Sequence, residues 1–578
     1  MKLKNADETH RRRILSNNCS EDLLQYKFAE VSIGELNGNI FQKTLGRYAR
    51  VPTFSTYKDG TDSDYAKLED SLRSFNTVII ALHNLEKSDK DNYGVRGSTR
   101  DFIARLQVHK RIILVVFGNP YLLSNFAGLQ NVVVAYDDSP TAQSLTAQLI
   151  FGATGANGRL PVTASSQFKA GDGEVINPIG RIKYTMPDEL GISPASLLKI
   201  DSIAIDGIVK KAYPGCTIMA IKDGKVFYAK AFGTHTYLDR TLTQLDDVFD
   251  LASVTKISST VLATMKLYDQ GLLDLHKPIS TYLPELINTN KQNIRLIDLL
   301  THQAGLVPYI PFYLAAMKEP GVFSPDSSAG YPVRVAQHMY QRADYFKQVI
   351  WKQVIASPIK TPGKYVYSDL SMYFMRAVVE KVSNDKLDNF AMKTFYEPLG
   401  LTTMGFNPRN RIAVNRFMPT ENDKLWRKQL LVGDVHDQGA AMQGGVAGHA
   451  GLFSDVIDLA TLGQMLLQHG IYAERSYIKE STVDMFNTRP YPLTSRRGIG
   501  FDKPEKDPQQ YPGSKYASQE TFGHTGFTGT CIWVDPDVNL VYVFLSNRIC
   551  PDGENAELSA LRIRAKIQNA FYEAILKH

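Results

Sequence analysis

The stretch Ser253-Val254-Thr255-Lys256 decides how this chain is interpreted. It follows the run Phe249-Asp250-Leu251-Ala252 and opens a long apolar segment that is predicted to be a helix. A spacing of three residues places the serine hydroxyl and the lysine amine on one helical face. The partial positive charge of a helix N-terminus favours an alkoxide and a neutral amine there. The stretch therefore predicts an activated serine beside its own base.

The Ser-x-x-Lys spacing alone is weak support, because short motifs often arise by chance. It recurs at five other pairs: Ser55/Lys58, Ser166/Lys169, Ser196/Lys199, Ser383/Lys386 and Ser476/Lys479. Ser253 combines three features: Tyr367-Ser368-Asp369 and His524-Thr525-Gly526 follow it in order, it opens a long predicted helix, and a predicted buried segment precedes it. Of the five alternatives, only Ser196 shares the first two features, and it lacks the third. This combination favours Ser253 as the nucleophile over the five alternatives.

These three elements, in this order, resemble the serine β-lactamases and penicillin-binding proteins, particularly their class C-like branch. That branch carries Ser-x-x-Lys, then Tyr-x-Asn, then Lys-Thr-Gly or His-Thr-Gly. Two further segments, Asp298–Leu306 (DLLTHQAGL) and Gly448–Ser454 (GHAGLFS), are similar to segments of the same family. The resemblance covers about residues 190–578. It implies an antiparallel sheet with flanking helices and a helical subdomain.

The chain departs from the family pattern at two positions. Asp369 stands where many members have Asn, and His524 stands where β-lactamases proper have Lys. His-Thr-Gly occurs in some D-alanyl-D-alanine carboxypeptidases and esterases of the superfamily. The resemblance therefore implies action on D-amino-acid peptides of cell-wall origin or on small esters. It also implies a periplasmic or cell-envelope location, although Met1–Arg13 is polar and shows no export signal.

Three side chains are predicted to carry the chemistry. Ser253 would attack, and Lys256 would act as its base if burial lowers the lysine pKa. Tyr367 would be a second proton carrier, sharing a proton with Lys256 so that the two titrate as a pair. The alternatives are a solvated surface cation for Lys256 and a core tyrosine for Tyr367. The apolar flanks Val254 and Ile257 favour a buried, functional lysine.

The remaining predicted site residues bind and orient the substrate. Asp369 would orient Lys256 or a substrate amide, and the neutral imidazole of His524 would contact a substrate carboxylate or Tyr367. Thr525 and Gly526 complete this binding strand, because a glycine lets a backbone approach closely. The N–H groups of Ser253 and Phe527 are the predicted oxyanion hole.

Three other histidines lie near these motifs. His302 and His449 occupy glycine-containing loops, where a histidine that bonds the backbone is more common than a catalytic one. The dipeptide His436-Asp437 resembles a family loop, and its role stays open.

Length and composition place the chain among ordinary globular proteins. Its 578 residues exceed one hydrophobic core, so two or more domains are expected. An apolar content of 43% and a charged content of 21% are ordinary for such proteins. The net charge of +6 is small for this length, and the sequence shows no basic stripe that would predict nucleic-acid binding. No apolar run is long enough to span a membrane.

No cofactor and no metal site are predicted, because the histidines and acidic residues form no recognisable ligand motif. The four cysteines lack Cys-x-x-Cys spacing and are interpreted as buried free thiols. The expected partner is a small-molecule or peptide substrate, including peptidoglycan fragments.

Residues 23–165 predict a mainly parallel α/β sandwich, after a polar tail at residues 1–22. Its strands are expected at residues 28–33, 76–82, 111–117 and 131–136, and its helices at about residues 63–74, 97–108 and 139–151. Near-continuous apolar strands that alternate with helices are typical of a parallel sheet covered on both faces. No glycine-rich phosphate-binding loop follows the first strand.

The end of this region, Phe151-Gly152 with Gly158–Thr163 (GRLPVT), resembles the C-terminal α/β sandwich of family 3 glycoside hydrolases. The resemblance implies a β-N-acetylglucosaminidase–serine hydrolase fusion. The catalytic residues of such glycosidases lie on a barrel, and the chain shows no barrel segment. Glycosidase activity is therefore not expected.

A Gly-rich polar linker is expected at residues 166–190, before the hydrolase domain at residues 191–578. Asp223-Gly224 predicts a hairpin between early strands, and late strands are expected near residues 531–534 and 541–545. Helix-rich sequence at residues 256–485 separates them. The sequence thus predicts a serine hydrolase that acts through an acyl-enzyme; the alternatives are a β-lactamase proper and a non-catalytic scaffold.

Overall fold

The computed structural model describes residues 2–4, 27–505 and 512–576, so most of the predicted tail and Cys19 lie outside the described residues. The chain divides into two compact units. The first runs to Tyr184 and includes the short later segments Glu397–Thr402 and Tyr472–Arg475, and the second contains the rest. Cys216, Cys531 and Cys550 are buried free thiols, as predicted.

The first unit is built on a sheet with the strand order β1-β6-β5-β4-β2-β3. Its five parallel strands are β2 (Phe28–Ile33), β3 (Thr53–Thr56), β4 (Thr77–Leu82), β5 (Arg111–Val116) and β6 (Asn131–Val134). Strand β1 (Lys2–Lys4) pairs antiparallel with β6. Because the first parallel strand lies between the second and the third, this is a doubly wound α/β order.

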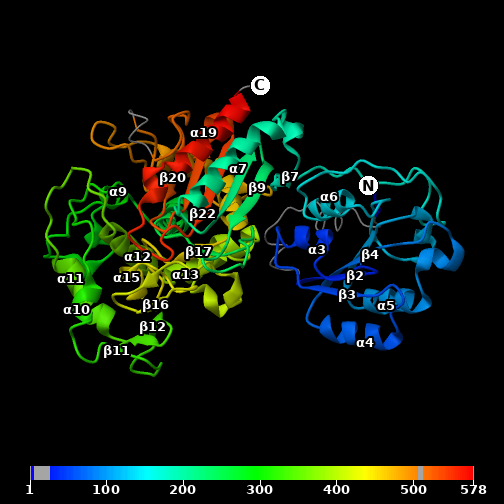
Figure 1. The fold of residues 1–578 in the computed structure, drawn as a ribbon, viewed down its shortest axis with the longest axis horizontal. Coiled ribbons are helices and arrows are strands. Elements are labelled where there is room, and N and C mark those ends of the chain that lie inside the picture. Colours follow the sequence, from blue (N-terminus) through cyan, green and yellow to red (C-terminus); the bar gives the residue numbers. More distant parts are fainter. Residues whose placement is uncertain (1, 5–26, 506–511, 577–578) are drawn as a thin grey trace. The chain divides into compact units, whose positions relative to one another are not determined.

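Helices cover both faces of this sheet (Figure 1). They are α3 (Ile40–Leu45), α4 (Asp62–Ser71), α5 (Gly97–Gln107) and α6 (Pro140–Ile150). Helix α3 packs against α6, and α4 packs against α5 on the opposite face. The predicted parallel sandwich is confirmed, whereas the short β3 and α3 were not predicted. All six residues of β4 are buried, which explains its near-continuous apolar sequence.

The second unit is built on an antiparallel sheet in which the order is β20-β21-β22-β8-β9. The strands are β8 (Gly215–Lys222), β9 (Lys225–Gly233), β20 (Phe522–Thr525), β21 (Cys531–Asp535) and β22 (Leu540–Ser546). The predicted hairpin joins β8 to β9, and Asp223 and Gly224 both have positive φ angles, of 52° and 72°. A tight two-residue hairpin turn requires this conformation.

The early and late helices of the second unit lie together on one face of this sheet. They are α7 (Pro194–Val209) and α19 (Ile563–Leu576), and they pack against each other. Helix α16 (Val456–Leu467) packs against β21, β22 and β8. A side chain at Gly463 would lie within 2.8 Å of Ile532 and Val541, so a glycine is needed for this close approach.

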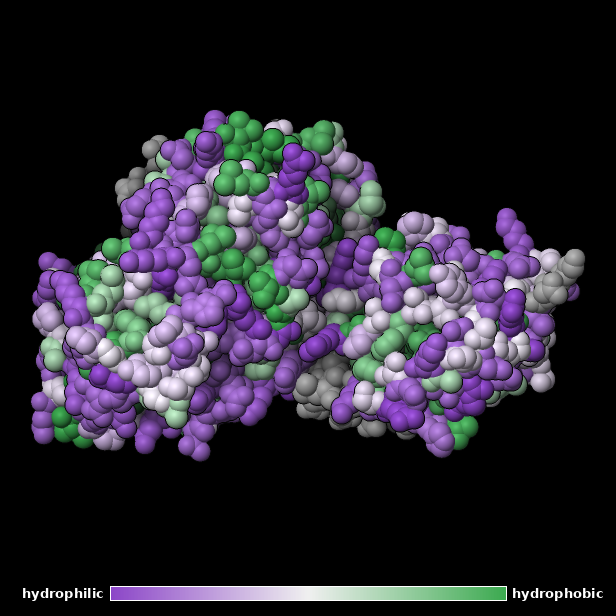
Figure 2. Space-filling view, turned by 60° about the horizontal axis from the view of Figure 1, so that its bottom comes forward, coloured by the Kyte–Doolittle hydropathy of each residue, from purple (hydrophilic) through white to green (hydrophobic). Residues whose placement is uncertain are grey.

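A helical region separates the early and late strands, as predicted. It includes α8 (Val261–Asp269), α9 (Leu296–Leu300) and α12 (Leu370–Ser383), and α12 packs against both α8 and α9. None of the helices among the described residues is long and apolar enough to cross a membrane. The face in Figure 2 is largely hydrophilic, with hydrophobic residues in separate groups.

Candidate active site

Ser253 lies in a tight turn between strand β10 (Phe249–Asp250) and the helical segment that leads into α8. The preceding residue, Ala252, has a φ angle of +46°, a conformation that is uncommon for a residue with a side chain. The buried carboxylate of Asp250 holds this turn, because its Oδ1 accepts the Ala252 N–H at 2.9 Å. The turn leaves the Ser253 side chain partly exposed.

Lys256 begins a π-helical turn, Lys256–Thr260, instead of lying in the first turn of a regular α-helix. Its side chain is fully buried, and its Nζ donates to Ser253 Oγ at 2.8 Å and to the carbonyl oxygen of His449 at 3.0 Å. A third partner is Asp369, whose Oδ1 lies 2.8 Å from Nζ. The lysine therefore touches both the predicted nucleophile and the predicted orienting carboxylate.

The electrostatics around Lys256 differ from the expectation that burial lowers its pKa. Burial does act in that direction, but the charges of Asp369 and Tyr367 outweigh it and leave the pKa raised. A buried ammonium with a carboxylate at 2.8 Å is stabilised in its charged form. Lys256 is thus a cation at neutral pH, and the expectation of a neutral amine is wrong.

Tyr367 approaches the serine from the segment before α12, and its Oη donates to Ser253 Oγ at 3.0 Å. The His302 ring lies beside its ring at 4.5 Å, and the guanidinium of Arg497 lies over it at 5.3 Å. Burial raises the pKa of the Tyr367 phenol, and the positive charges of Lys256 and Arg497 offset this only in part. The phenol is therefore protonated at neutral pH.

His524 lies on β20 with only 3% of its surface exposed. Its Nδ1 lies 2.7 Å from the carbonyl oxygen of Thr525 and can only donate to it, which leaves Nε2 as an acceptor. Burial and the charges of Arg497 and Lys256 lower the pKa of His524 to about 3. The imidazole is neutral throughout the physiological range, and its ring centroid is 6.1 Å from that of Tyr367.

The loop after β20 is tied to the turn that carries Ser253. Thr528 Oγ1 donates to the carbonyl oxygen of Asp250 at 2.7 Å, and Thr530 Oγ1 donates to that of Leu251 at 2.9 Å. A side chain on Gly526 would lie 2.5 Å from the Leu251 carbonyl oxygen, so only glycine fits there. These contacts hold the backbone of residues 526–530 against the residues that precede the nucleophile.

The two N–H groups of the predicted oxyanion hole, those of Ser253 and Phe527, have no protein acceptor among the described residues. Phe527 is 53% exposed, the Arg548 guanidinium lies over its ring at 4.5 Å, and the His436 ring stacks on it with centroids 5.3 Å apart. His436, whose role the sequence left open, also lies 2.8 Å from Glu421.

Two polar pairs beside the site were not predicted. Arg497 is buried and pairs with Asp502 at 3.6 Å. Burial is the largest cause of the lowered pKa values of His302 and His524, and the positive charge of Arg497 is the second largest. Asp437 lies 2.7 Å from His449 Nε2, next to the carbonyl group that binds Lys256. No short motif surrounds Arg497, so only its position in space reveals it.

His302 bonds the backbone, as expected, because its Nδ1 accepts the N–H of Ser368 at 3.2 Å. A small cavity of about 50 Å³ borders Asp369 and lies between the loop Tyr309–Tyr313 and the pair Asp437–His449. The structure thus brings Ser253, Lys256, Tyr367 and Asp369 into direct contact and places His524 next to them.

Comparisons with known proteins identify the relatives of this chain. The family model for Beta-lactamase matches residues 200–565. A Bacillus subtilis (strain 168) protein named N-acetylmuramyl-L-alanine amidase is 30% identical over 402 residues, which cover 65% of this chain and 85% of that protein. A Salmonella agona protein, provisionally named a D-alanyl-D-alanine carboxypeptidase, is 30% identical over 389 residues, which cover 63% of this chain and 85% of that protein.

Two solved structures are also similar. A penicillin-binding protein homologue from Caulobacter crescentus has a TM-score of 0.48 and 17% identity, covering 66% of this chain and 99% of that one. A class C β-lactamase from Rhodobacter sphaeroides has a TM-score of 0.47 and 20% identity, with the same coverage. The family model spans more than half of the sequence. The chain therefore belongs to the beta-lactamase family, as a serine hydrolase.

Proposed function

We propose that this hydrolase cleaves an amide bond in peptidoglycan fragments, with Ser253 as the nucleophile. The observation that carries the proposal is the double contact of Ser253 Oγ, with Lys256 Nζ at 2.8 Å and Tyr367 Oη at 3.0 Å. A serine hydroxyl becomes a nucleophile when such groups can take its proton. The substrate class is supported by the amidase from Bacillus subtilis, of which the matched region covers 85%.

The bond that we favour joins the lactyl carboxyl group of N-acetylmuramic acid to the amine of L-alanine, as that relative's name indicates. The terminal D-alanyl-D-alanine bond is the second candidate, because another relative is named for it. The small cavity beside Asp369 has room for a small side chain such as the methyl group of alanine.

The protonation of the resting site defines the first step. Lys256 is a cation and Tyr367 is a phenol, because both pKa values are raised. The reactive form is therefore the one in which the Lys256–Tyr367 pair has lost one proton. The two groups titrate together, so this loss belongs to the pair as a whole. Ser253 Oγ attacks the amide carbonyl carbon and passes its proton to the Tyr367 oxygen, while the Lys256 ammonium stabilises the negative charge.

The same pair completes the reaction. Tyr367 returns the proton to the leaving amine as the C–N bond breaks, which leaves an ester between Ser253 and the acyl group. A water molecule then attacks this ester, and the pair takes a proton from the water and returns one to Ser253 Oγ. The N–H groups of Ser253 and Phe527 would hold the oxyanion in both steps, and one such donor is worth about 3 kcal/mol.

The remaining site residues would position the substrate. Asp369 would hold Lys256 in place through their 2.8 Å ion pair. His524, Thr525 and Gly526 would contact the substrate from the end of β20. Since His524 is neutral and its Nδ1 hydrogen is directed to the Thr525 carbonyl oxygen, its Nε2 would accept a hydrogen bond from the substrate, and the ring would not act as a cation for a carboxylate.

We also propose the domain assignment that the sequence indicates. Residues 191–578 would form the hydrolase domain, residues 166–190 a linker, and residues 23–165 an accessory domain of the family 3 glycoside hydrolase C-terminal type. The parallel sheet order of the first unit is compatible with this accessory type. It carries no catalytic role in the proposed reaction.

The test uses the purified full chain and three substrates: a muramoyl-L-alanyl peptide, a peptide ending in D-alanyl-D-alanine, and a p-nitrophenyl ester. Products are identified by mass spectrometry. We expect free N-acetylmuramic acid and a free L-alanyl peptide from the first substrate, and no product from the Ser253→Ala variant. Release of D-alanine alone would replace the favoured bond by the second candidate. Turnover of the ester alone would contradict an amidase.

A further inference from the structure

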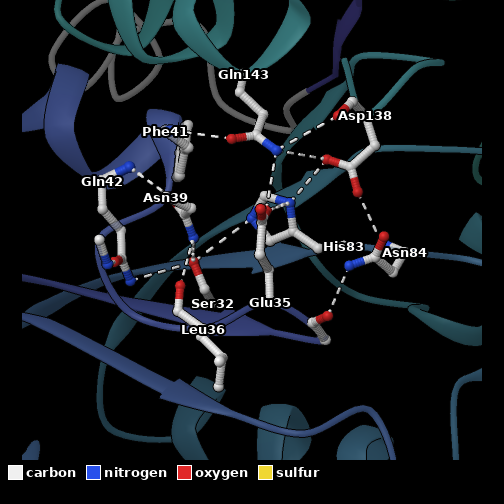
Figure 3. A network of polar contacts seen from close by, with 12 residues as sticks. Ser32, Glu35, Leu36, Asn39, Phe41, Gln42, His83, Asn84, Asp138 and Gln143 are labelled. Carbon is white, nitrogen blue, oxygen red and sulfur yellow. Dashed lines mark hydrogen bonds and ion pairs between the residues drawn. The ribbon is translucent and has the colours of Figure 1, made fainter. Parts of the chain in front are cut away.

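A second group of polar side chains lies in the first unit, at the carboxyl ends of its parallel strands (Figure 3). Glu35 follows β2, His83 directly follows β4, and Asp138 follows β6. Strands β2 and β4 are neighbours, although β3 separates them in sequence. Crevices at such a reversal of strand order are where open α/β sheets bind ligands. We call Glu35, His83 and Asp138 the switch-point cluster.

The three side chains converge on a single point. His83 Nδ1 lies 2.8 Å from Asp138 Oδ1 and 3.1 Å from Glu35 Oε2, and all three atoms lie within 4.8 Å of one another. The His83 side chain is completely buried, whereas the side chains of Glu35 and Asp138 are 33% and 21% exposed. The cluster is thus anchored by the histidine and open to solvent on its carboxylate side.

We propose that the switch-point cluster binds a divalent transition-metal ion, with Zn²⁺ as the ion that suits it best. Imidazole nitrogen and carboxylate oxygen are both ordinary zinc ligands, and three protein ligands plus water is a common zinc arrangement. The donor set has no thiolate and mixes nitrogen with oxygen, which favours Zn²⁺ or Mn²⁺ over Cu⁺ and over Ca²⁺.

The charges within the cluster support a bound cation. Among the residues that the structure describes, His83 is the only group able to carry a positive charge within ion-pair distance of Glu35 or Asp138. Its Nδ1 faces both carboxylates, and a single N–H cannot point well at two acceptors. A metal ion at the centre would instead bind all three atoms at once.

The surrounding residues supply the outer hydrogen bonds that metal sites require. A ligating histidine almost always places its second ring nitrogen against a polar partner. Here His83 Nε2 lies 3.5 Å from the buried hydroxyl of Ser32, and the ring stacks on Phe117 with centroids 4.6 Å apart. These contacts fix the direction in which Nδ1 points.

The two carboxylates are held in the same way (Figure 3). Gln143 Nε2 donates to Glu35 Oε2 at 3.0 Å and to Asp138 Oδ1 at 3.1 Å. The backbone N–H of Asn84 donates to Asp138 Oδ2 at 2.7 Å. Each proposed ligand is therefore oriented by a neighbour that is not itself a ligand.

The spacing of the ligand atoms fits after a small adjustment. Tetrahedral zinc with bonds of about 2.0–2.2 Å places its ligand atoms roughly 3.3–3.6 Å apart. The observed separations from His83 Nδ1 are 2.8 and 3.1 Å, so the carboxylates must move outward by a few tenths of an ångström. Their partial exposure leaves room for this movement and for a water ligand.

The test measures zinc binding to the full chain after removal of metals with a chelator. Isothermal titration with Zn²⁺ is carried out on the wild type and on His83→Ala, Glu35→Gln and Asp138→Asn. The last two are nearly isosteric and keep the fold testable if His83→Ala does not fold. A matched control is His469→Ala, because His469, Glu480 and Asp484 form a second group with metal-ligand spacing, on the surface of the other unit.

We expect one zinc site in the wild type. Each cluster variant should lower the zinc affinity of this site by more than the roughly 10- to 100-fold loss that follows removal of an outer hydrogen-bond partner. The His469→Ala variant should keep this site. Two results would overturn the proposal: no zinc binding by the wild type, or binding that survives in all three folded cluster variants. Loss of binding in His469→Ala alone would assign the ion to the other group.

Discussion

The pocket around Ser253 and the switch-point cluster are built by the same means but are not equally visible in the sequence. Each gathers polar side chains from three distant segments around one point. In the pocket, each segment supplies a short pattern, such as Ser253 with Lys256 or Tyr367 with Asp369. In the cluster, each strand end supplies a single residue with no partner nearby in sequence.

The two regions also differ in how they balance charge. The pocket pairs a buried cation with a carboxylate, so that Asp369 keeps Lys256 charged, and the neighbouring His524 stays neutral. The cluster sets two carboxylates against one histidine. The pocket thus pairs one cation with one carboxylate, whereas the cluster has two carboxylates and a single group able to carry a positive charge, and this difference separates a proton-transfer site from a proposed metal site.

The largest effect is expected from Ser253→Ala, which removes the nucleophile. We expect kcat/KM for the muramoyl-L-alanyl peptide to fall roughly 10⁴- to 10⁶-fold, as when a catalytic serine is lost elsewhere. Zinc binding by the switch-point cluster should be unchanged, because the two regions lie in different units. The control is Ser476→Ala, an exposed serine with the same Ser-x-x-Lys spacing, which should keep full activity.

Removal of one hydroxyl in Tyr367→Phe comes next. This change deletes the atom that we propose as the proton carrier, so kcat should fall by about 10²- to 10⁴-fold. The matched control is Tyr365→Phe, whose hydroxyl accepts from Arg497 at 3.2 Å instead of contacting Ser253. Steady-state kinetics decide the matter, and equal losses in both variants would show that Tyr367 acts only through packing.

Asp369→Asn should change the pH dependence more than the maximal rate. The charge of Asp369 raises the pKa of Lys256 and that of Tyr367, so activity in the wild type should rise with pH as their pair loses a proton. Without this charge, the same loss occurs more easily, and the rise should move to lower pH. Profiles of kcat/KM between pH 6 and pH 10 test this, and a shift to higher pH would contradict it.

The smallest effect concerns stability in acid. The folded-state pKa of His524 is about 3, below its ordinary value of 6.5. Between these values the unfolded chain binds a proton that the folded chain does not, so stability is lost as the pH falls through 6.5 towards 3. At pH 5 this loss is on the order of 2 kcal/mol.

His524→Asn should remove that contribution. We therefore expect its melting temperature to fall less between pH 7 and pH 5 than that of the wild type, as followed by circular dichroism. His469→Asn is the control: this histidine lies beside Asp484 with 45% of its side chain exposed, and the variant should lose as much stability between pH 7 and pH 5 as the wild type. A His524→Asn variant that loses as much stability as the wild type would show that His524 is not buried in a neutral form.

Much of the fold follows from local sequence patterns. Apolar strands such as β4 and β5 and the Asp223-Gly224 turn determine their structure through burial and backbone conformation. Strand β3 was not predicted because it is short and only partly buried. Helix α3 was not predicted because it is short and only partly apolar. Their structure depends on neighbours that are far away in sequence.

In the site, too, the features set by local sequence could be predicted, and those set by distant residues could not. Ser253, Lys256 and Tyr367 can be predicted because their motifs fix local geometry, and the structure places them in contact. The raised pKa of Lys256 could not be predicted, since it depends on the distance to Asp369, more than one hundred residues away. Arg497 was missed for a similar reason, because no short motif surrounds it in the sequence and only the folded structure brings it to the site.

The most direct test of the account is to find the residue that becomes acylated. The full chain is incubated with a fluorophosphonate or with a fluorescent penicillin, digested, and mapped by mass spectrometry. We predict one adduct, on the peptide that contains Ser253, and its loss in Ser253→Ala. An adduct on another serine in an active, folded protein would contradict the assembly of this pocket as the catalytic site.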